Sequence, residues 1–201
     1  QLKEVPTFTF KVGNTTYVAP EVKEAFHNAD DKAAGIYRYQ TTIKVADFNP
    51  ENGDVSFVVS NIQDKAGNKG ADVTAVTNKN VVRVDRTAPK SQYVAILSNK
   101  TENHKYVTNG QLVRVLAAFD EEINVTDKFV LTINGKNYKF QRSQDTTKYE
   151  YIVEFRIPAS ETSMPEGEIQ FAISGYEDFA GNTAEPLTKA NHYKYNTLKY
   201  D

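Results

Sequence analysis

A repeated set of residues most constrains how this chain can fold. Seven residues of the first half recur in the second half, and every pair is separated by the same 114 positions. The pairs are Gly53 and Gly167, Phe57 and Phe171, Ser60 and Ser174, Asp64 and Asp178, Ala66 and Ala180, Gly67 and Gly181, and Asn68 and Asn182. Internal repetition of this kind is typical of chains in which one structural module follows another. The sequence therefore predicts two copies of one module, at 1–85 and 86–201.

Alternating apolar and polar residues predict β-strands in both copies. The alternation is clearest at 8–12, 37–43, 112–116, 129–133 and 149–155, and Gly or Asn residues stand between many of these runs. Such alternation places one face of a strand on a core and the other in water, as in antiparallel sheets. We therefore expect an all-β chain of two tandem antiparallel β-sandwiches. The residues expected to face the core of the second copy are Val94, Ile96, Val113, Val115, Ala117, Leu131, Ile133, Ile152, Phe171 and Ile173.

The two copies differ at their starts. About forty residues separate Pro89 from Phe129, enough for two strands near 93–97 and 111–119, but only seven residues precede Phe8. The first sandwich is therefore expected to lack its N-terminal strands, which leaves a sheet edge and a core face uncovered. Two explanations stay open: the chain is a fragment, or a neighbouring molecule supplies a strand.

Composition excludes several classes of function. The chain has 24 basic and 26 acidic residues, so it lacks the positive excess that nucleic-acid binding needs. It has no apolar run of the roughly 18 residues that a membrane span requires. Without cysteine, disulfides, thiolate metal sites and cysteine nucleophiles are excluded. The sequence also contains neither a Gly-x-Ser-x-Gly elbow nor a glycine-rich phosphate loop, and we expect the chain not to be an enzyme.

Two turn sequences and one linker carry a resemblance to a known family. Asp-Lys-Ala-Gly-Asn at 64–68 and Asp-Phe-Ala-Gly-Asn at 178–182 resemble the turn before the last strand of tandem bacterial immunoglobulin-like (Ig-like) domains. Val-Asp-Arg-Thr-Ala-Pro at 84–89 resembles the link between such domains, and 110–122 resembles their second strand. The chain departs from the family at 183–195, which is longer than the usual return to the final strand.

The resemblance implies a secreted or cell-surface repeat of a bacterium. Such a repeat is non-catalytic and acts as a stalk, a spacer or an adhesive segment, for example of an adhesin. The alternative is an accessory module, including a glycan-binding one, of a large extracellular enzyme. The implied partners are neighbouring domains of a longer chain and a host or cell-surface protein or glycan, without nucleic acid and without membrane insertion. The tyrosines at 193, 195 and 200 fit either a closing strand or a glycan platform.

Acidic and amide side chains are expected to gather where the two copies join. The loops at the entry end of an Ig-like sandwich would bring five side chains toward Asp85, namely Asp120, Glu121, Glu122, Asp178 and Asn182. Their carboxylate and amide oxygens are the ligands that Ca²⁺ prefers, and the like charges repel one another unless they are neutralised. The sequence therefore predicts a calcium site held by Asp85, Asp120 or Glu122, Asp178 and Asn182. No other cofactor is expected.

Two other interpretations of these residues stay open. The side chains of Asp64, Asn68, Asp178 and Asn182 can accept hydrogen bonds from backbone amides of their own turns, a purely structural role. Alternatively, the guanidinium of Arg86 can bridge two of the carboxylates and neutralise them without a metal ion.

Overall fold

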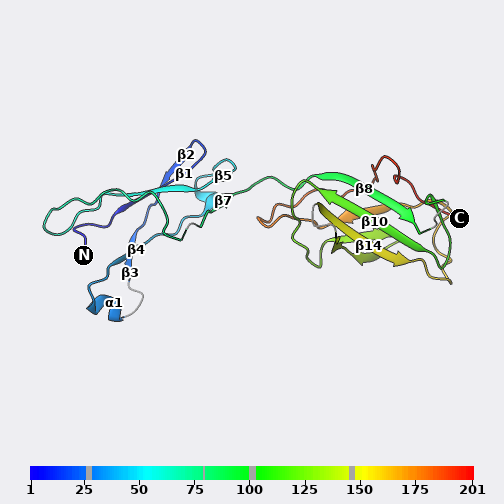
Figure 1. The fold of residues 1–201 in the computed structure, drawn as a ribbon, viewed down its shortest axis with the longest axis horizontal. Coiled ribbons are helices and arrows are strands. Elements are labelled where there is room, and N and C mark those ends of the chain that lie inside the picture. The colour runs from blue at the N-terminus through cyan, green and yellow to red at the C-terminus, as the bar shows by residue number, and fades with distance from the viewer. Residues whose placement is uncertain (26–28, 79, 100–102, 145–147) are drawn as a thin grey trace. The chain divides into compact units, whose positions relative to one another are not determined.

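The structure is a computed structural model, and Figure 1 shows its fold. Strands make up nearly all of its regular elements, so the chain is all-β, as the alternation predicts. The structure describes residues 1–25, 29–78, 80–99, 103–144 and 148–201.

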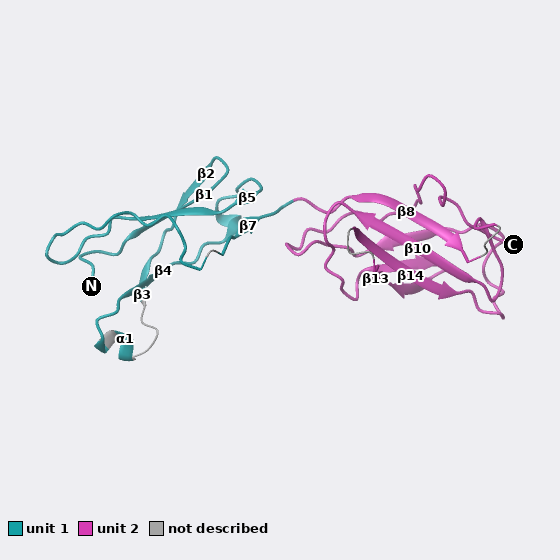
Figure 2. Ribbon diagram, viewed as in Figure 1, with its two compact units in different colours: residues 1–86 teal, residues 87–201 magenta. Residues whose placement is uncertain are grey.

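The chain divides into two compact units, Gln1–Arg86 and Thr87–Asp201 (Figure 2). The division lies one residue after the boundary placed from the sequence. It follows β7 (Arg83–Val84), the last strand of the first unit, and it precedes Pro89. Each unit is therefore built from consecutive residues.

Three antiparallel strands form the main sheet of the first unit. β1 (Thr7–Val12) lies in the middle and pairs with β2 (Thr15–Val18) on one side and with β6 (Ser56–Ser60) on the other. The other elements of this unit are short: β3 (Lys23–Ala25) paired with β4 (Arg38–Gln40), β5 (Gly53–Asp54) paired with β7, the α-helix α1 (Ala29–Ala33) and the 3₁₀-helix η1 (Val45–Asp47).

The first unit buries few apolar side chains. Among its described residues, Val12 and Val84 are the only buried apolar side chains apart from Pro6 and Pro50, whereas Val81 and Val82 are 71% and 65% exposed. No strand precedes β1 in the described part of this unit. The first unit therefore has a small apolar core.

Two antiparallel sheets form the second unit and share one core. Their strand orders are β13-β14-β10-β8 and β12-β11-β16. A small third sheet has the order β15-β17-β9, in which β17 and β9 are parallel. The strands are β8 (Ser91–Ser98), β9 (Tyr106–Val107), β10 (Leu112–Phe119), β11 (Val130–Ile133), β12 (Lys136–Lys139), β13 (Gln141–Arg142), β14 (Tyr149–Arg156), β15 (Gly167–Glu168), β16 (Phe171–Ser174) and β17 (Lys199–Tyr200).

Aromatic rings fill the middle of this core. The ring of Phe129 is fully buried and stacks on Phe140, with 4.4 Å between the ring centroids. Phe119 and Tyr151 meet Phe129 edge to face at 6.1 and 5.5 Å. Buried aromatic side chains remove large apolar areas from water, and pairs in these geometries add to that stabilisation. The second unit therefore has the well-filled core that the first unit lacks.

Nine of the ten residues predicted to face the core are buried, and one prediction is wrong. Ile152 is only half-buried, because the core face of β14 is formed by Tyr151, Val153 and Phe155. Side chains alternate along a strand, so Ile152 lies on the opposite face, across from the half-buried Leu116 of β10.

Candidate functional site

The Asp-x-Ala-Gly-Asn turn has the same geometry in both units. In the first unit, the backbone N–H and the side-chain amide of Asn68 donate to Oδ1 and Oδ2 of Asp64, both over 2.8 Å. In the second unit, the same groups of Asn182 donate to Oδ1 and Oδ2 of Asp178, over 2.8 and 2.7 Å. Each aspartate thus binds both donors of the asparagine four residues later. This is the structural role that the turn sequence allowed.

The two turns differ in how far they are buried. Asp178 is 2% exposed, whereas Asp64 is half-buried. The hydrogen bonds from the side chain and the backbone of Asn68 hold the pKa of the Asp64 carboxyl below its ordinary value, because they favour the ionised form. Water solvates the carboxylate of Asp178 less than that of Asp64. The stability of the turn in the second unit therefore depends more on the hydrogen bonds that this carboxylate accepts.

Backbone pairing around the turns repeats at the offset of 114 seen in the sequence. Two single-residue antiparallel bridges flank each turn, and the outer bridge is closed in both units by two backbone hydrogen bonds of 2.8–3.0 Å. The equivalent bridges are Val59–Val73 and Ile173–Leu187, and Gln63–Lys69 and Glu177–Thr183. The two units therefore share one β module around the turn.

Two of the predicted calcium ligands already bind other protein groups. Oδ1 of Asp120 accepts the backbone N–H of Lys90 over 2.8 Å. Glu122 forms an ion pair with Arg142. These contacts neutralise or solvate both carboxylates without a metal ion, so their role as calcium ligands stays a prediction.

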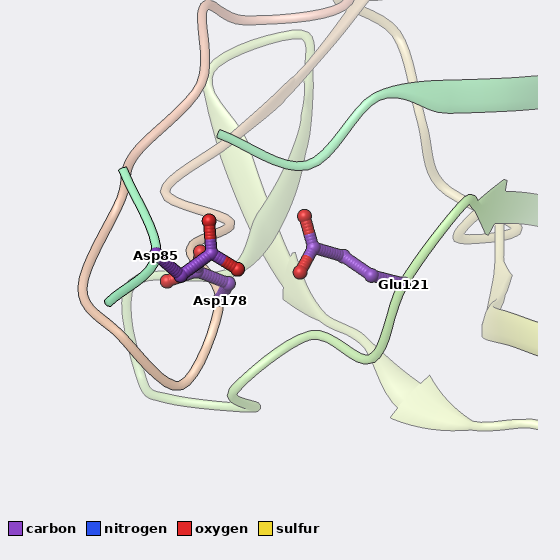
Figure 3. A group of neighbouring side chains, drawn as sticks. All are labelled: Asp85, Glu121 and Asp178. Atoms are coloured by element: carbon purple, nitrogen blue, oxygen red, sulfur yellow. The ribbon is translucent and has the colours of Figure 1, made fainter. Parts of the chain in front are cut away.

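Glu121 is the acidic residue that the structure brings close to Asp178. An oxygen atom of its carboxylate lies within 4.8 Å of one from Asp178 (Figure 3). Two charges at this distance repel by about 0.9 kcal/mol even in bulk water. The sequence had placed Glu121 in this acidic cluster but had selected its neighbours Asp120 and Glu122 as the calcium ligands.

Asp85, which Figure 3 also labels, belongs to the first unit and contacts a loop there. The side-chain amide of Asn52 donates to Oδ1 of Asp85 over 3.4 Å, and the Asn52 oxygen accepts the N–H of Arg86 over 2.9 Å. The guanidinium of Arg86 donates to the carbonyl of Pro50 over 3.2 Å and to the side chain of Asn49. Arg86 thus holds the loop at 49–52, and calcium binding by Asp85 stays a prediction.

A buried carboxylate of the second unit had no signal in the sequence. The side chain of Glu161 is 6% exposed, and its Oε1 accepts the hydroxyl and the N–H of Ser163 over 2.6 and 2.8 Å. Its Oε2 lies 3.0 Å from Nζ of Lys136. Hydrogen bonds from Ser163 and Lys136 lower the pKa of the Glu161 carboxyl to about 2, and the same pairing raises the pKa of Lys136.

We expect this carboxylate to make the second unit sensitive to acid. The pKa of Glu161 is depressed in the fold, so its stabilisation is present above the ordinary value of 4.5 and is lost as the pH falls from there toward 2. Urea unfolding at several pH values should show this loss in the natural protein and a shallower one in Glu161→Gln. The exposed Glu166→Gln is the control, and equal pH dependence in both variants would contradict the assignment.

The closing strand that the sequence allowed forms at Tyr200, in β17, but not at Tyr193 and Tyr195. Residues 191–195 form no strand, and instead run beside β8, the outer strand of its sheet. The N–H groups of Asn191 and His192 donate to the carbonyl of Val94 over 2.9 and 3.0 Å, and the N–H of Ile96 donates to the carbonyl of Tyr195 over 3.0 Å. β17, which contains Tyr200, lies between β15 and β9 in the small sheet.

Both histidines that the structure describes contact tyrosine rings, and His27 lies outside the described residues. His192 stacks on Tyr195 with 5.2 Å between centroids, and His104 meets Tyr195 edge to face at 5.4 Å. The ring centroids of Tyr193 and His192 are 4.5 Å apart, and Tyr193 is 89% exposed. The stretch thus presents a row of rings on the surface of the second unit.

In comparisons with known proteins, no family model, no curated protein and no solved structure matches this chain. Within the described residues, every helix is too short to cross a membrane.

Proposed function

We propose that this chain is a non-catalytic extracellular repeat module, which acts as a stalk, a spacer or an adhesive segment of a bacterial surface protein. The observation that carries the proposal is the repeated turn, with Asp64 and Asp178 in the same hydrogen-bonded geometry and the same flanking backbone pairs. Each repeat of a β module brings its own strands, so a chain can be lengthened by adding copies that each fold in the same way. The resemblance of the turns and the linker to bacterial Ig-like domains supports a secreted or cell-surface location.

The spacer role is tested by surface display. A terminal epitope tag is anchored to a cell through zero, one or two copies of the whole chain, and an antibody coupled to a large bead reports access to the tag. Access should rise with each copy, because folded repeats carry the tag beyond the cell envelope. A flexible Gly/Ser linker of equal residue number is the control for chain length. Access that does not depend on the number of copies would contradict the spacer role.

The second candidate function is an accessory module that binds glycans beside an extracellular enzyme. One observation favours it, namely the 89% exposure of Tyr193 within a row of aromatic rings. Exposed aromatic rings can stack on the apolar faces of sugars while a polar group bonds their hydroxyls.

A further inference from the structure

We propose that the first unit binds an extended segment of a partner polypeptide by β-strand addition. The segment pairs with the open edge of β4 and takes the place that β10 has in the second unit. In this mode of recognition, main-chain hydrogen bonds provide affinity and alternate side chains provide specificity. The inference rests on the adhesive role within the proposed function, and the spacer role does not need it.

β4 is the counterpart of β14 in the second unit. The N–H of Leu2 donates to the hydroxyl of Tyr39 in β4 over 3.1 Å. In the same way, the N–H of Ile123 donates to the hydroxyl of Tyr151 in β14 over 2.8 Å. Each strand is also paired with a short antiparallel strand, β3 beside β4 and β13 beside β14. The two tyrosines therefore fix the register in which the units correspond.

The other edge of these two strands differs between the units. β14 pairs there with β10 along its whole length, from Tyr149 to Arg156. Within the described residues, β4 pairs with β3 alone. An outer strand offers its unpaired N–H and carbonyl groups to an added strand, so β4 has an edge at which a segment can bind.

The apolar face that the second unit covers is partly open in the first. Paired apolar residues of the main sheets occupy equivalent positions, namely Phe8–Val59 and Phe10–Phe57 in the first unit and Leu131–Ile173 and Ile133–Phe171 in the second. The four residues of the second unit are buried in one core with the inward side chains of β10. The four residues of the first unit are only half-buried, since no counterpart of β10 lies over them in the described part of that unit.

Val82 shows that the open face extends beyond these four residues. Its carbonyl accepts the N–H of Val55 over 2.8 Å, as the carbonyl of Leu198 accepts the N–H of Ile169 in the second unit. Val82 is nevertheless 65% exposed, whereas Leu198 is 1% exposed. Val82 and Phe57 also line a hollow of about 420 Å³ whose other walls include Phe10, Val76 and Val81. Open apolar surface of this kind is typical of protein–protein binding sites.

The second unit defines the chemistry of the segment. Every second residue of β10 from Val113 to Phe119 is apolar and buried. Ala117 lies opposite Tyr151, so the ring is accommodated beside a small side chain. The partner segment is therefore apolar at alternate positions, with a small residue opposite Tyr39.

A second copy of this chain does not offer its own β10 to this edge. Both edges of that strand are already used, because β10 pairs with β14 on one side and with β8 on the other. The next edge, at Val94 and Ile96 of β8, is covered by the stretch at 191–195. The segment therefore comes from a different polypeptide.

The test uses β10 itself as the probe. A labelled synthetic peptide with the sequence of residues 110–122 is titrated with the whole chain, and fluorescence anisotropy reports binding. We expect saturable binding that slows hydrogen exchange in β4 and leaves β14 unchanged. In the peptide, Val115→Ser should weaken binding at least about tenfold, because this side chain faces the core. Leu116→Ser is the matched control, since Leu116 lies on the other face of the strand and should matter less.

A tethered copy of the strand tests the position of the site. Leu2 corresponds to Ile123, so Gln1 corresponds to Glu122. A second copy of residues 110–121 fused directly before Gln1 therefore has the spacing that β10 has in the second unit. The fusion should close the edge of β4, block the free peptide and raise the unfolding temperature of the first unit. A fusion with the same residues in scrambled order is the control and should do neither.

Several results would overturn the inference. These are no binding of the peptide, equal losses in Val115→Ser and Leu116→Ser, or peptide binding that the fusion does not reduce. Self-association of the chain that protects β4 and excludes the peptide would assign this edge to a second copy instead. A chain that extends the epitope tag but binds no peptide overturns this inference alone. A chain that binds the peptide but does not extend the tag overturns the spacer role alone.

Discussion

Replacing Gly175 by alanine is expected to destabilise the second unit by more than about 4 kcal/mol. Gly175 follows β16 with a φ of +70°, where an L-residue costs roughly 1–2 kcal/mol. An added Cβ would also lie 2.0 Å from the carbonyl oxygen of Lys128, a backbone atom just before β11. Because that contact cannot be relieved by a side-chain rotation, the chain at Lys128 would have to move.

Hydrogen exchange followed by mass spectrometry measures this effect in each unit separately. Amides of β11 and β16 should lose protection in Gly175→Ala, while those of β1 keep it. Gly135→Ala is the matched control, because Gly135 has a φ of +73° and no atom within 4 Å of an added Cβ. The stability lost in Gly135→Ala should come from backbone strain alone. Similar losses in the two variants would show that the contact with Lys128 does not constrain the fold.

Replacing Asp178 by alanine is expected to cost the second unit about 3 kcal/mol. The carboxylate accepts two hydrogen bonds from Asn182, and bonds to a charged group contribute roughly 1.5–3 kcal/mol each. The change also leaves the N–H and amide donors of Asn182 without these acceptors. Asp64→Ala removes the same pair of bonds at a more exposed turn, so we expect a smaller loss there.

Thermal unfolding in millimolar calcium and in EDTA separates the structural role of this turn from the calcium site. If the turn is structural, the natural protein unfolds at the same temperature in both conditions, and Asp178→Ala loses the same stability in each. If calcium binds, calcium raises the midpoint of the natural protein, because it binds only the folded state, and Asp178→Ala abolishes the rise. The second result would support the cation site and contradict a purely structural turn.

The turn and its aspartates could be predicted from the sequence because their interactions are local. Asp178 and Asn182 are four residues apart, and the side chain of one reaches the backbone of the other within a single turn. The repeat at Asp64 and Asn68 doubled that signal. Strand alternation was also informative, since a period of two distinguishes buried from exposed faces without knowledge of the partner strand.

One error concerned a local pattern, and two other features depend on distant residues. In the run at 149–155, Ile152 shares its face with Glu150 and Glu154, so the alternation favoured the opposite face, with Tyr151, as the core face, and the choice of Ile152 was wrong. Glu161 could not be distinguished from exposed acids, because Lys136 is 25 positions away along the chain. The position of Glu121 near Asp178 likewise depends on how two loops of the second unit meet.

The stretch at 191–195 has a consequence for solubility. An outer strand with free backbone groups invites identical chains to join edge to edge, and the hazard grows when many copies are crowded together. The second unit covers the N–H groups of Val94 and Ile96 on β8 with its own chain. Crowded copies therefore lack an open ladder at this edge from which a fibril could grow. We therefore expect the stretch at 191–195 to reduce edge-to-edge association at β8.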